Sequence, residues 1–290
     1  MSRPAGQSAD RLLHPSNRFP RRLARFNAWL YGVAVGRWLR RRLDRAVELR
    51  SVEVPLMRLG PALDGLQIAF LSDLHAGHFT TELDLVRLFE RVVRCEPDLI
   101  CLGGDLVDAR PEDCRILAKA LPTLHAPLGV FAVPGNHEYY ADPKLRLWQH
   151  CLEQHGVTVL LNRGVRIRRG DETLWLAGVD DLSEGEPDLA EALDGVRLDE
   201  PIVLLCHHPD FFLEAAYAGV DLMLSGHTHA GQITVFGRTP LKHTRHGYWH
   251  GHFEQRGARL YVGSGTGTTA IPLRIHATAE VPLIRLVRPR

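Results

Sequence analysis

Aspartate, asparagine and histidine side chains follow five short apolar runs of this chain, and these residue types can bind a metal ion. The runs IAFL, LICL, VFAV, IVLL and LMLS are followed by SDLHAG, GGDLVD, PGNHE, CHHPD and GHTHAG. The last stretch carries two histidines one residue apart, His227 and His229. Each stretch alone is equally well explained as a loop cap or a polar surface turn. Five of them in one chain, each after an apolar run, favour a shared site.

The donor atoms in these stretches indicate the kind of metal. They offer carboxylate oxygen, amide oxygen and imidazole nitrogen, a mixture that suits Mn, Fe or Zn better than Ca or Mg. Seven or more ligands exceed the need of one tetrahedral ion. Two ions about 3.5–4 Å apart, bridged by one carboxylate, would use them. The polar residues at the five run ends are Asp73, His75, Asp105, Asp108, Asn136, His137, His207, His208, His227 and His229.

The elements that must position these side chains follow from the apolar pattern. Strands are predicted at residues 66–72, 99–103, 129–135, 174–179, 202–206, 222–226, 259–263 and 281–286. Helical segments are predicted at 82–95, 111–121, 143–155 and 209–218. Strands alternating with helices indicate an α/β fold, and the carboxyl ends of its parallel strands share one edge. From about Ile233 strands dominate, which predicts a mixed sheet.

Composition limits the class of protein. The chain has 290 residues, 45% of them hydrophobic, which is enough for one large domain with an arm. Its net charge of +1 indicates no specific nucleic-acid partner. The five cysteines are odd in number and form no C-x-x-C pair, which disfavours a disulfide framework or a cysteine zinc site. A reducing compartment, the cytoplasm, is therefore expected.

The N-terminal segment differs from the rest. Residues 1–19 are polar and predicted to be disordered, and residues 20–50 combine nine arginines with the apolar stretch FNAWLYGVAVG. Three interpretations remain open for 20–50: a basic amphipathic helix in peripheral contact with the inner face of a membrane, a helix packed on the domain, or a twin-arginine export signal. RWLRRR stands where the export cleavage site should be, which disfavours the third. The sequence contains no run of 18 or more apolar residues, so no transmembrane helix is predicted.

The five motifs D-x-H, G-D-x-x-D, G-N-H-E, H-x-P and G-H-x-H, in this order and from about Val52 to the C-terminus, resemble the calcineurin-like metallophosphoesterase superfamily. GHTHAGQI with the later GSGTGTTAIPLRI is most similar to the bacterial YkuE/YaeI-like branch. The resemblance implies a four-layer αββα sandwich with two mixed β-sheets over residues 51–290. It also implies two divalent metal ions, Mn, Fe or Zn, of which Mn is favoured.

The resemblance also implies a role for each matching residue. It assigns the first ion to Asp73, His75, Asp105 and His229. It assigns the second ion to Asp105, Asn136, His207 and His227. His137 matches the catalytic histidine, and Asp108 matches the acid that orients it, whereas His208 falls where the branch varies.

The predicted function is hydrolysis of a phosphodiester or pyrophosphate by attack of a metal-bound hydroxide, with His137 donating a proton to the leaving oxygen. One alternative is a UDP-2,3-diacylglucosamine-type pyrophosphatase acting on a membrane-derived nucleotide-lipid, which the basic segment 20–50 suggests. A non-catalytic binding module on the same fold is a further alternative. It would be expected to lack a ligand or the catalytic histidine, and none is missing.

Other polar stretches are assigned weaker roles. GSGTGTTA at 263–270 lacks the Gly-Lys-Ser/Thr ending of a phosphate loop and is predicted to be a flexible loop near the site. Cys206 is predicted to be a small buried residue. The histidine-rich stretch 242–252 is interpreted as a solvated loop, with lining of the substrate entrance as the alternative. Its histidines are His243, His246, His250 and His252.

Overall fold

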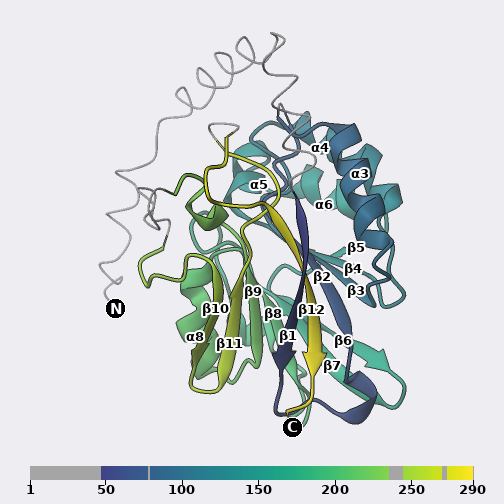
Figure 1. The fold of residues 1–290 in the computed structure, drawn as a ribbon, viewed down its shortest axis with the longest axis vertical. Helices are drawn as coiled ribbons and strands as arrows, with labels where there is room; N and C mark the ends of the chain where they lie inside the picture. Colours follow the sequence, from purple (N-terminus) through teal and green to yellow (C-terminus); the bar gives the residue numbers. More distant parts are fainter. Residues whose placement is uncertain (1–46, 78, 235–243, 270–272, 290) are drawn as a thin grey trace. The chain divides into compact units, whose positions relative to one another are not determined.

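Two six-stranded sheets carry the fold (Figure 1), in a computed structural model that describes residues 47–77, 79–234, 244–269 and 273–289. The first sheet has, in spatial order, β1 (Glu48–Pro55), β12 (Glu280–Val287), β2 (Gln67–Leu71), β3 (Leu99–Gly103), β4 (Val130–Val133) and β5 (Val157–Val159). The second has β10 (Gly251–Gln255), β11 (Ala258–Val262), β9 (Leu222–Ser225), β8 (Ile202–Leu205), β7 (Glu172–Gly178) and β6 (Arg163–Arg169).

Both sheets are mixed. In the first, β2, β3, β4 and β5 run parallel, and β12 joins β2 antiparallel with β1 parallel beside it. In the second, β7, β8, β9 and β11 are parallel, and β6 and β10 are added antiparallel at the two edges. The crossovers along β2, β3, β4 and β5 and along β7, β8 and β9 contain helices, whereas the antiparallel pairs β6–β7 and β10–β11 are joined by tight turns. The prediction of a mixed sheet is confirmed.

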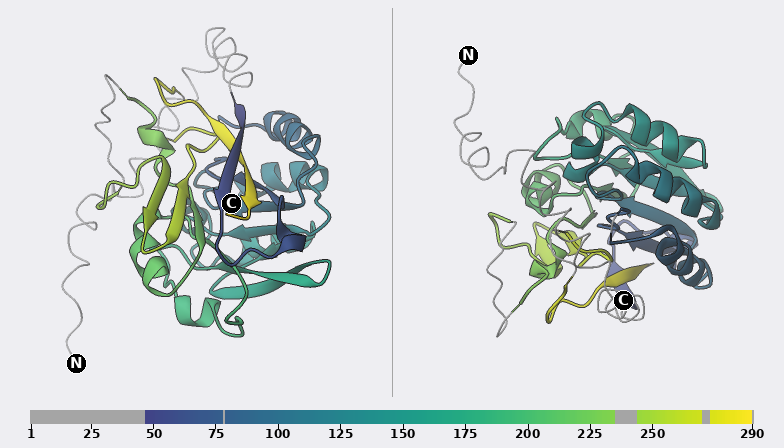
Figure 2. Two further views of the ribbon diagram at one scale, coloured as in Figure 1. Left: turned by 60° about the horizontal axis from the view of Figure 1, so that its bottom comes forward. Right: turned by 90° about the horizontal axis from the view of Figure 1, so that it is seen from above.

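Helices cover the outer faces of the two sheets (Figures 1 and 2). The first sheet is covered by α3 (Glu82–Val93), α4 (Asp113–Ala120) and α6 (Arg146–Glu153), and the second by α7 (Leu189–Ala192) and α8 (Phe212–Tyr217). The short helix α5 (Asn136–Ala141) begins directly after β4. The start of α3 is encoded locally, because Thr81 and Asp84 form a reciprocal capping box that satisfies two terminal N–H groups.

Alternating side chains define the layers. Along β2, Ile68 and Phe70 point into the core between the sheets, and Ala69 and Leu71 point to the helices. Full burial of a side chain such as Phe70 contributes about 1.5–3 kcal/mol. The second sheet repeats the pattern, with Leu205 in the central core and other residues against α8. Three buried layers of side chains separate four layers of elements, so the predicted αββα sandwich is confirmed.

Most of the predicted elements are present, with ends that differ by a few residues. Elements that the apolar pattern missed are β1, β5, β6, β10, α5 and α7. The end of the predicted helix 20–50 is wrong, because residues 48–50 belong to β1, which pairs along its whole length with β12. In β1 the exposed Glu53 stands between the buried Val52 and Val54, so no continuous apolar run marks this strand. Residues 1–46, which contain the predicted disordered segment and most of that helix, lie outside the described residues.

Within the part of the chain that the structure describes, no helix combines the length and the apolar character that crossing a bilayer requires.

Candidate metal centre

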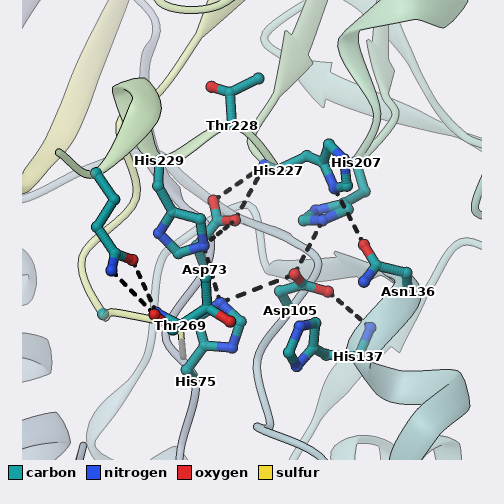
Figure 3. Close-up of polar contacts among 12 residues, drawn as sticks. Asp73, His75, Asp105, Asn136, His137, His207, His227, Thr228, His229 and Thr269 are labelled. Carbon is teal, nitrogen blue, oxygen red and sulfur yellow. Dashed lines mark hydrogen bonds and ion pairs between the residues drawn. The ribbon is translucent and has the colours of Figure 1, made fainter. Parts of the chain in front are cut away.

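All nine residues predicted for the site lie at one edge of the domain, where the carboxyl ends of strands from both sheets meet, and Figure 3 labels each of them except Asp108, which lies beside His75 and His137. The first sheet contributes the segments after β2, β3 and β4, and the second contributes those after β8 and β9. Parallel strands bring their carboxyl ends to the same edge, which explains why residues far apart in the sequence converge here. His75 and His229 touch across 154 positions of the chain.

The first ligand group consists of four buried residues whose donor atoms all lie within 4.8 Å of one another. Its members are Asp73, His75, Asp105 and His229. The Nε2 atoms of His75 and His229 are 3.0 Å apart, and His229 Nε2 lies 3.4 Å from Asp73 Oδ1. His75 Nε2 lies 3.8 Å from Asp105 Oδ2. Two nitrogen ligands of one ion, each at about 2.0–2.1 Å from it, also stand about 3 Å apart.

The second ligand group shares Asp105 with the first. The donor atoms of Asp105, His207 and His227 lie within 4.8 Å of one another, and the Asn136 Oδ1 atom is 3.0 Å from His227 Nδ1. His207 Nε2 is 3.2 Å from Asp105 Oδ2, the same oxygen that faces His75. Asp105 therefore stands between the two groups, as a bridging carboxylate would.

The ring of His207 fits a metal ligand. Its Nδ1 donates to the carbonyl oxygen of Gly103 at 2.8 Å, because a carbonyl only accepts, and Nε2 is the ring atom that faces Asp105. Nε2 is buried and has no hydrogen-bond partner, although the Asp105 carboxylate lies beside it. A backbone carbonyl on the far nitrogen is the usual support of a metal-binding histidine. A cation between Nε2 and Asp105 would satisfy both atoms.

Electrostatics favour a cation at the same place. Burial raises the pKa of Asp73 to about 6, and the nearby Asp105 carboxylate adds to the rise. Burial also lowers the pKa of His75 and His229 well below the usual range, so neither ring holds a proton readily. Although burial opposes it, the carboxylate of Asp105 raises the pKa of His207 well above normal. Positive charge is therefore stabilised around Asp105, which is what a divalent ion supplies.

The backbone of the centre is strained. Five of the seven predicted ligands have positive φ angles: Asp73 (53°), His75 (47°), Asp105 (52°), His227 (71°) and His229 (52°). Residues other than glycine adopt this conformation at a cost of about 1–3 kcal/mol each, and such residues cluster at functional sites. The strained turns aim consecutive side chains of one loop in directions that a regular strand end does not allow.

Close packing around Asp105 requires a glycine. A Cβ atom on Gly135 would stand 2.4 Å from Asp105 Oδ1 and 2.8 Å from the Cδ2 atom of His207. Because Gly135 has no side chain, the loop after β4 can approach the Asp105 carboxylate closely. There the backbone N–H of His137 donates to Asp105 Oδ1 at 2.9 Å.

Glu138 organises the centre, and the sequence pattern did not single it out. Its buried carboxylate accepts hydrogen bonds from four backbone N–H groups on two loops. The donors are Asp105 (2.8 Å), Leu106 (2.6 Å), Val107 (3.2 Å) and Gly135 (2.7 Å). It thus joins the loop after β3 to the start of α5. Glu138 is the third residue of α5, a position at which glutamate commonly caps the start of a helix. This position could have identified it from the sequence.

His137 and Asp108 lie together, but their contact differs from the expected one. The Nδ1 atom of His137 contacts the backbone carbonyl oxygen of Asp108, and the Asp108 carboxylate is 3.8 Å away from it. The same carboxylate is 3.8 Å from the Nδ1 atom of His75. Burial disfavours the charged ring of His137, yet Asp105 and Asp108 raise its pKa. Asp108 therefore faces both rings, one of them in the first ligand group.

The glycine-rich stretch predicted to lie near the site is found there. Gly267 N donates to the Asp73 carbonyl oxygen at 2.8 Å, and Thr266 N to that of Ser72 at 3.2 Å. Cys206 is fully buried, and burial raises the pKa of its thiol, in agreement with a small core residue.

The histidine-rich stretch is divided in its surroundings. His246 and His252 are exposed, whereas His250 Nε2 pairs with Glu280 Oε1 at 3.1 Å. His243 lies outside the described residues. The carbonyl oxygen of Trp249 accepts from Thr228 in the turn of the centre, so this stretch borders the site. His208 packs its ring against the ring of His227, with centroids 4.3 Å apart.

Comparisons with known proteins bear on the family of the chain. A family model described as calcineurin-like phosphoesterase matches residues 66–231. A Bos taurus protein named transmembrane protein with metallophosphoesterase domain is 34% identical over 247 residues, which cover 80% of this chain and 55% of that protein. The chain thus spans about half the length of that relative. The uncharacterized metallophosphoesterase YkuE of Bacillus subtilis is 31% identical over 231 residues, covering 77% of this chain and 79% of YkuE.

Among solved structures, the phosphopantetheinyl hydrolase of Mycobacterium tuberculosis matches with a TM-score of 0.45 and 13% identity. The match covers 70% of this chain and 91% of that one.

Proposed function

The chain belongs to the calcineurin-like phosphoesterase family, and we propose that it hydrolyses a phosphodiester or a pyrophosphate on a pair of divalent ions. The observation that carries this proposal is the shared carboxylate. Asp105 Oδ2 faces His75 of the first ligand group and His207 of the second. Two ions bound on either side of it would neutralise phosphoryl oxygens and lower the pKa of a water that attacks phosphorus. The mixed oxygen and nitrogen donors suit Mn, Fe or Zn, and Mn is the ion that we favour.

The chain's own residues would divide the remaining work. The two ligand groups would hold the ions, and the Glu138 carboxylate and the His137 N–H hold Asp105 in place. His137 stands beside the centre with its Nδ1 directed at the Asp108 carbonyl oxygen, so its other nitrogen is available to donate a proton to the leaving oxygen. The carboxylates of Asp105 and Asp108 raise the pKa of His137, which favours the protonated ring. Asp108, which faces the ring, would help to retain that proton.

The second candidate is a substrate with an apolar portion, such as a UDP-2,3-diacylglucosamine-type nucleotide-lipid. Two exposed apolar residues border the turn that carries His227 and His229. The carbonyl oxygen of Trp249 accepts from Thr228, and Ile275 N donates to the carbonyl oxygen of Gln232. Peripheral contact of residues 20–50 with the inner face of a membrane would bring the protein to such a substrate.

A metal-controlled activity assay tests the proposal. Protein stripped with a chelator and reloaded with Mn, Fe or Zn is expected to bind two ions per chain. The loaded protein is expected to hydrolyse bis-p-nitrophenyl phosphate, a nucleoside diphosphate ester or both, and the stripped protein to hydrolyse neither. Full loading with two ions and no hydrolysis of any phosphoester would contradict the proposal, and so would unchanged hydrolysis after stripping.

The same assay separates the two candidates. A nucleotide-lipid presented in mixed micelles is compared with the corresponding free nucleotide diphosphate. Removal of residues 1–46 is expected to reduce hydrolysis of the lipid substrate alone if the lipid candidate holds. Equal hydrolysis of both substrates, before and after removal, would favour the small ester.

A further inference from the structure

Arg274 lies beside the first ligand group and uses its whole guanidinium group in hydrogen bonds. Nε and Nη2 donate to the Gly267 carbonyl oxygen at 3.0 and 2.6 Å. Nη1 donates to the carbonyl oxygens of Ala277 at 3.3 Å and of His229 at 3.4 Å. Nη2 also lies 3.2 Å from the ring atom Nδ1 of His229. A planar, forked donor with five N–H groups suits this set of converging acceptors.

Through these contacts Arg274 reaches two members of the first ligand group. It holds the His229 turn directly, by the backbone carbonyl oxygen and by the ring. It holds Asp73 through the glycine-rich loop, because Gly267, its main acceptor, donates its own N–H to the Asp73 carbonyl oxygen at 2.8 Å. Gly265 adds to the tight contact, since a Cβ there would stand 2.6 Å from the Asp73 Cβ. Arg274 therefore joins the loops that carry Asp73 and His229.

The turn that Arg274 supports needs an external hold. His229, Ala230 and Gln232 all have positive φ angles, at 52°, 50° and 49°. Such a turn is retained only where its surroundings compensate for the strain. The hydrogen bonds of Arg274 to the carbonyl oxygens do not depend on which nitrogen of the His229 ring carries a proton or an ion.

The contact with the ring itself does depend on that state. Arginine only donates, so the 3.2 Å contact assigns the His229 proton to Nε2. That proton can then be donated to His75 Nε2, 3.0 Å away. An ion on Nε2 would move the proton to Nδ1 and end this contact. The influence of Arg274 on a metal-loaded centre would therefore be exerted through the carbonyl oxygens.

The second ligand group has other supports. His207 is held by the carbonyl oxygen of Gly103, and Asn136 begins α5, which Glu138 fastens. Within the described residues, every hydrogen bond of Arg274 goes to Gly267, His229 or Ala277. His227 is the one member of the second group that shares the His229 turn, and its N–H donates to Asp73 Oδ1 at 3.0 Å. Its ring is also held from the other side, because Nδ1 contacts Asn136 Oδ1 at 3.0 Å.

Given the proposed dinuclear function, we propose that Arg274 is a positioning residue for the first ligand group and that the two ions depend on it unequally. Its hydrogen-bond fork holds Asp73 and His229 at the spacing that one ion requires. The other ion keeps Asp105, Asn136 and His207, which Arg274 does not contact, and its fourth ligand, His227, is also held by Asn136. Removal of Arg274 therefore converts a two-ion centre into one that binds a single ion tightly.

The test measures metal binding by isothermal titration calorimetry and by elemental analysis after gel filtration, with Mn as the probe. Arg274→Ala is expected to bind one Mn about 10- to 100-fold more weakly, the range for lost supporting contacts, and the other with wild-type affinity. Arg274→Lys keeps the charge without the fork and is expected to behave like the alanine variant. Wild-type affinity for both ions in Arg274→Ala, wild-type behaviour of Arg274→Lys, or equal weakening of both ions would overturn the proposal.

Arg58→Ala is the matched control for a structural loss. Arg58 also forms a hydrogen-bonded fork, half-buried, to Asp221 and to the carbonyl oxygens of Leu198 and Gly219, at the opposite edge of the sheets. Its removal is expected to lower the melting temperature and leave both Mn affinities unchanged. If it weakens one ion as Arg274→Ala does, selective loss is a general effect of instability and the proposal fails. A wild-type protein that binds fewer than two Mn would instead refute the dinuclear function itself.

Discussion

The two edges of the sheets handle charge in opposite ways. At the edge where strands begin, charged groups are paired: Arg58 holds Asp221, which also accepts from Ile202 N at 2.6 Å, and Arg166 pairs with Glu200. At the edge where strands end, carboxylates and imidazoles are buried against one another on strained backbone. One edge stabilises the fold, and the other gives up stability to hold a reactive arrangement.

The comparison of the two edges shows where the protein needs an added cation. Asp221 and Glu200 have their counter-charges within the chain, and no further ion is needed there. Around Asp105, burial lowers the pKa of His75 and His229, whereas the Asp105 carboxylate raises the pKa of His207 and of His137. The two raised values show that positive charge is favoured beside this carboxylate. A bound cation would neutralise the buried carboxylates at that edge.

Asp105→Asn is expected to have the largest effect, because one carboxylate serves both ligand groups. Hydrolysis should fall by at least about 10³-fold, more than the loss of one transition-state hydrogen bond, and neither ion should be retained after gel filtration. Elemental analysis and phosphoesterase rates measure the two outcomes. Retention of two ions by this variant would show that Asp105 does not bridge.

His137→Ala is expected to reduce turnover by about 10²- to 10⁴-fold, the contribution of a positioned general acid. Metal content should stay near that of the wild type, because His137 belongs to neither ligand group. The comparison of turnover with metal content separates a proton donor from a ligand. Loss of both ions would show that the division between ligand and acid is wrong.

Asp73→Asn tests the stability of the metal-free protein. Burial disfavours the Asp73 carboxylate, so the amide is expected to raise the free energy of unfolding by about 0.5–2 kcal/mol. The matched variant at the other edge, Asp221→Asn, should lower it by about 1–3 kcal/mol, because it weakens the bonds to Arg58 and Ile202. Urea unfolding with a chelator present measures both. Effects of the same sign would abolish the contrast between the edges.

The smallest effect is expected from acid. Burial works the other way, but hydrogen bonds from Arg166 and Thr173 lower the pKa of Glu200 to about 2. A carboxylate with a lowered pKa in the folded state stabilises above its unfolded pKa, about 4.3, and this contribution is lost as the pH falls towards 2. The urea midpoint of the wild type should therefore drop more steeply than that of Glu200→Gln across this window. Parallel curves would contradict the assignment.

The sequence predicted the ligand residues because each follows an apolar run, and parallel strands share an edge whatever their loops do. It did not predict Glu138, whose role depends on the exact approach of two loops, or Arg274, whose acceptors are backbone carbonyl oxygens that a sequence does not display. β1 was missed because charged and polar residues interrupt it: only Val52 and Val54 are buried, and Glu53 stands between them. Asp108 was expected to meet His137 with its carboxylate, but the turn presents the carbonyl oxygen instead.

The separation of His75 and His229 by 154 positions has a consequence for how the protein folds. Contacts between such distant segments form late, after the loop-closure entropy of the intervening chain has been overcome. Neither ligand group can exist until both sheets have formed and docked, so an unfolded or half-folded chain offers no high-affinity site. Metal would then bind the native state alone and stabilise it by mass action. The rate at which tightly bound ions appear during refolding would therefore report the rate at which the two sheets finally dock.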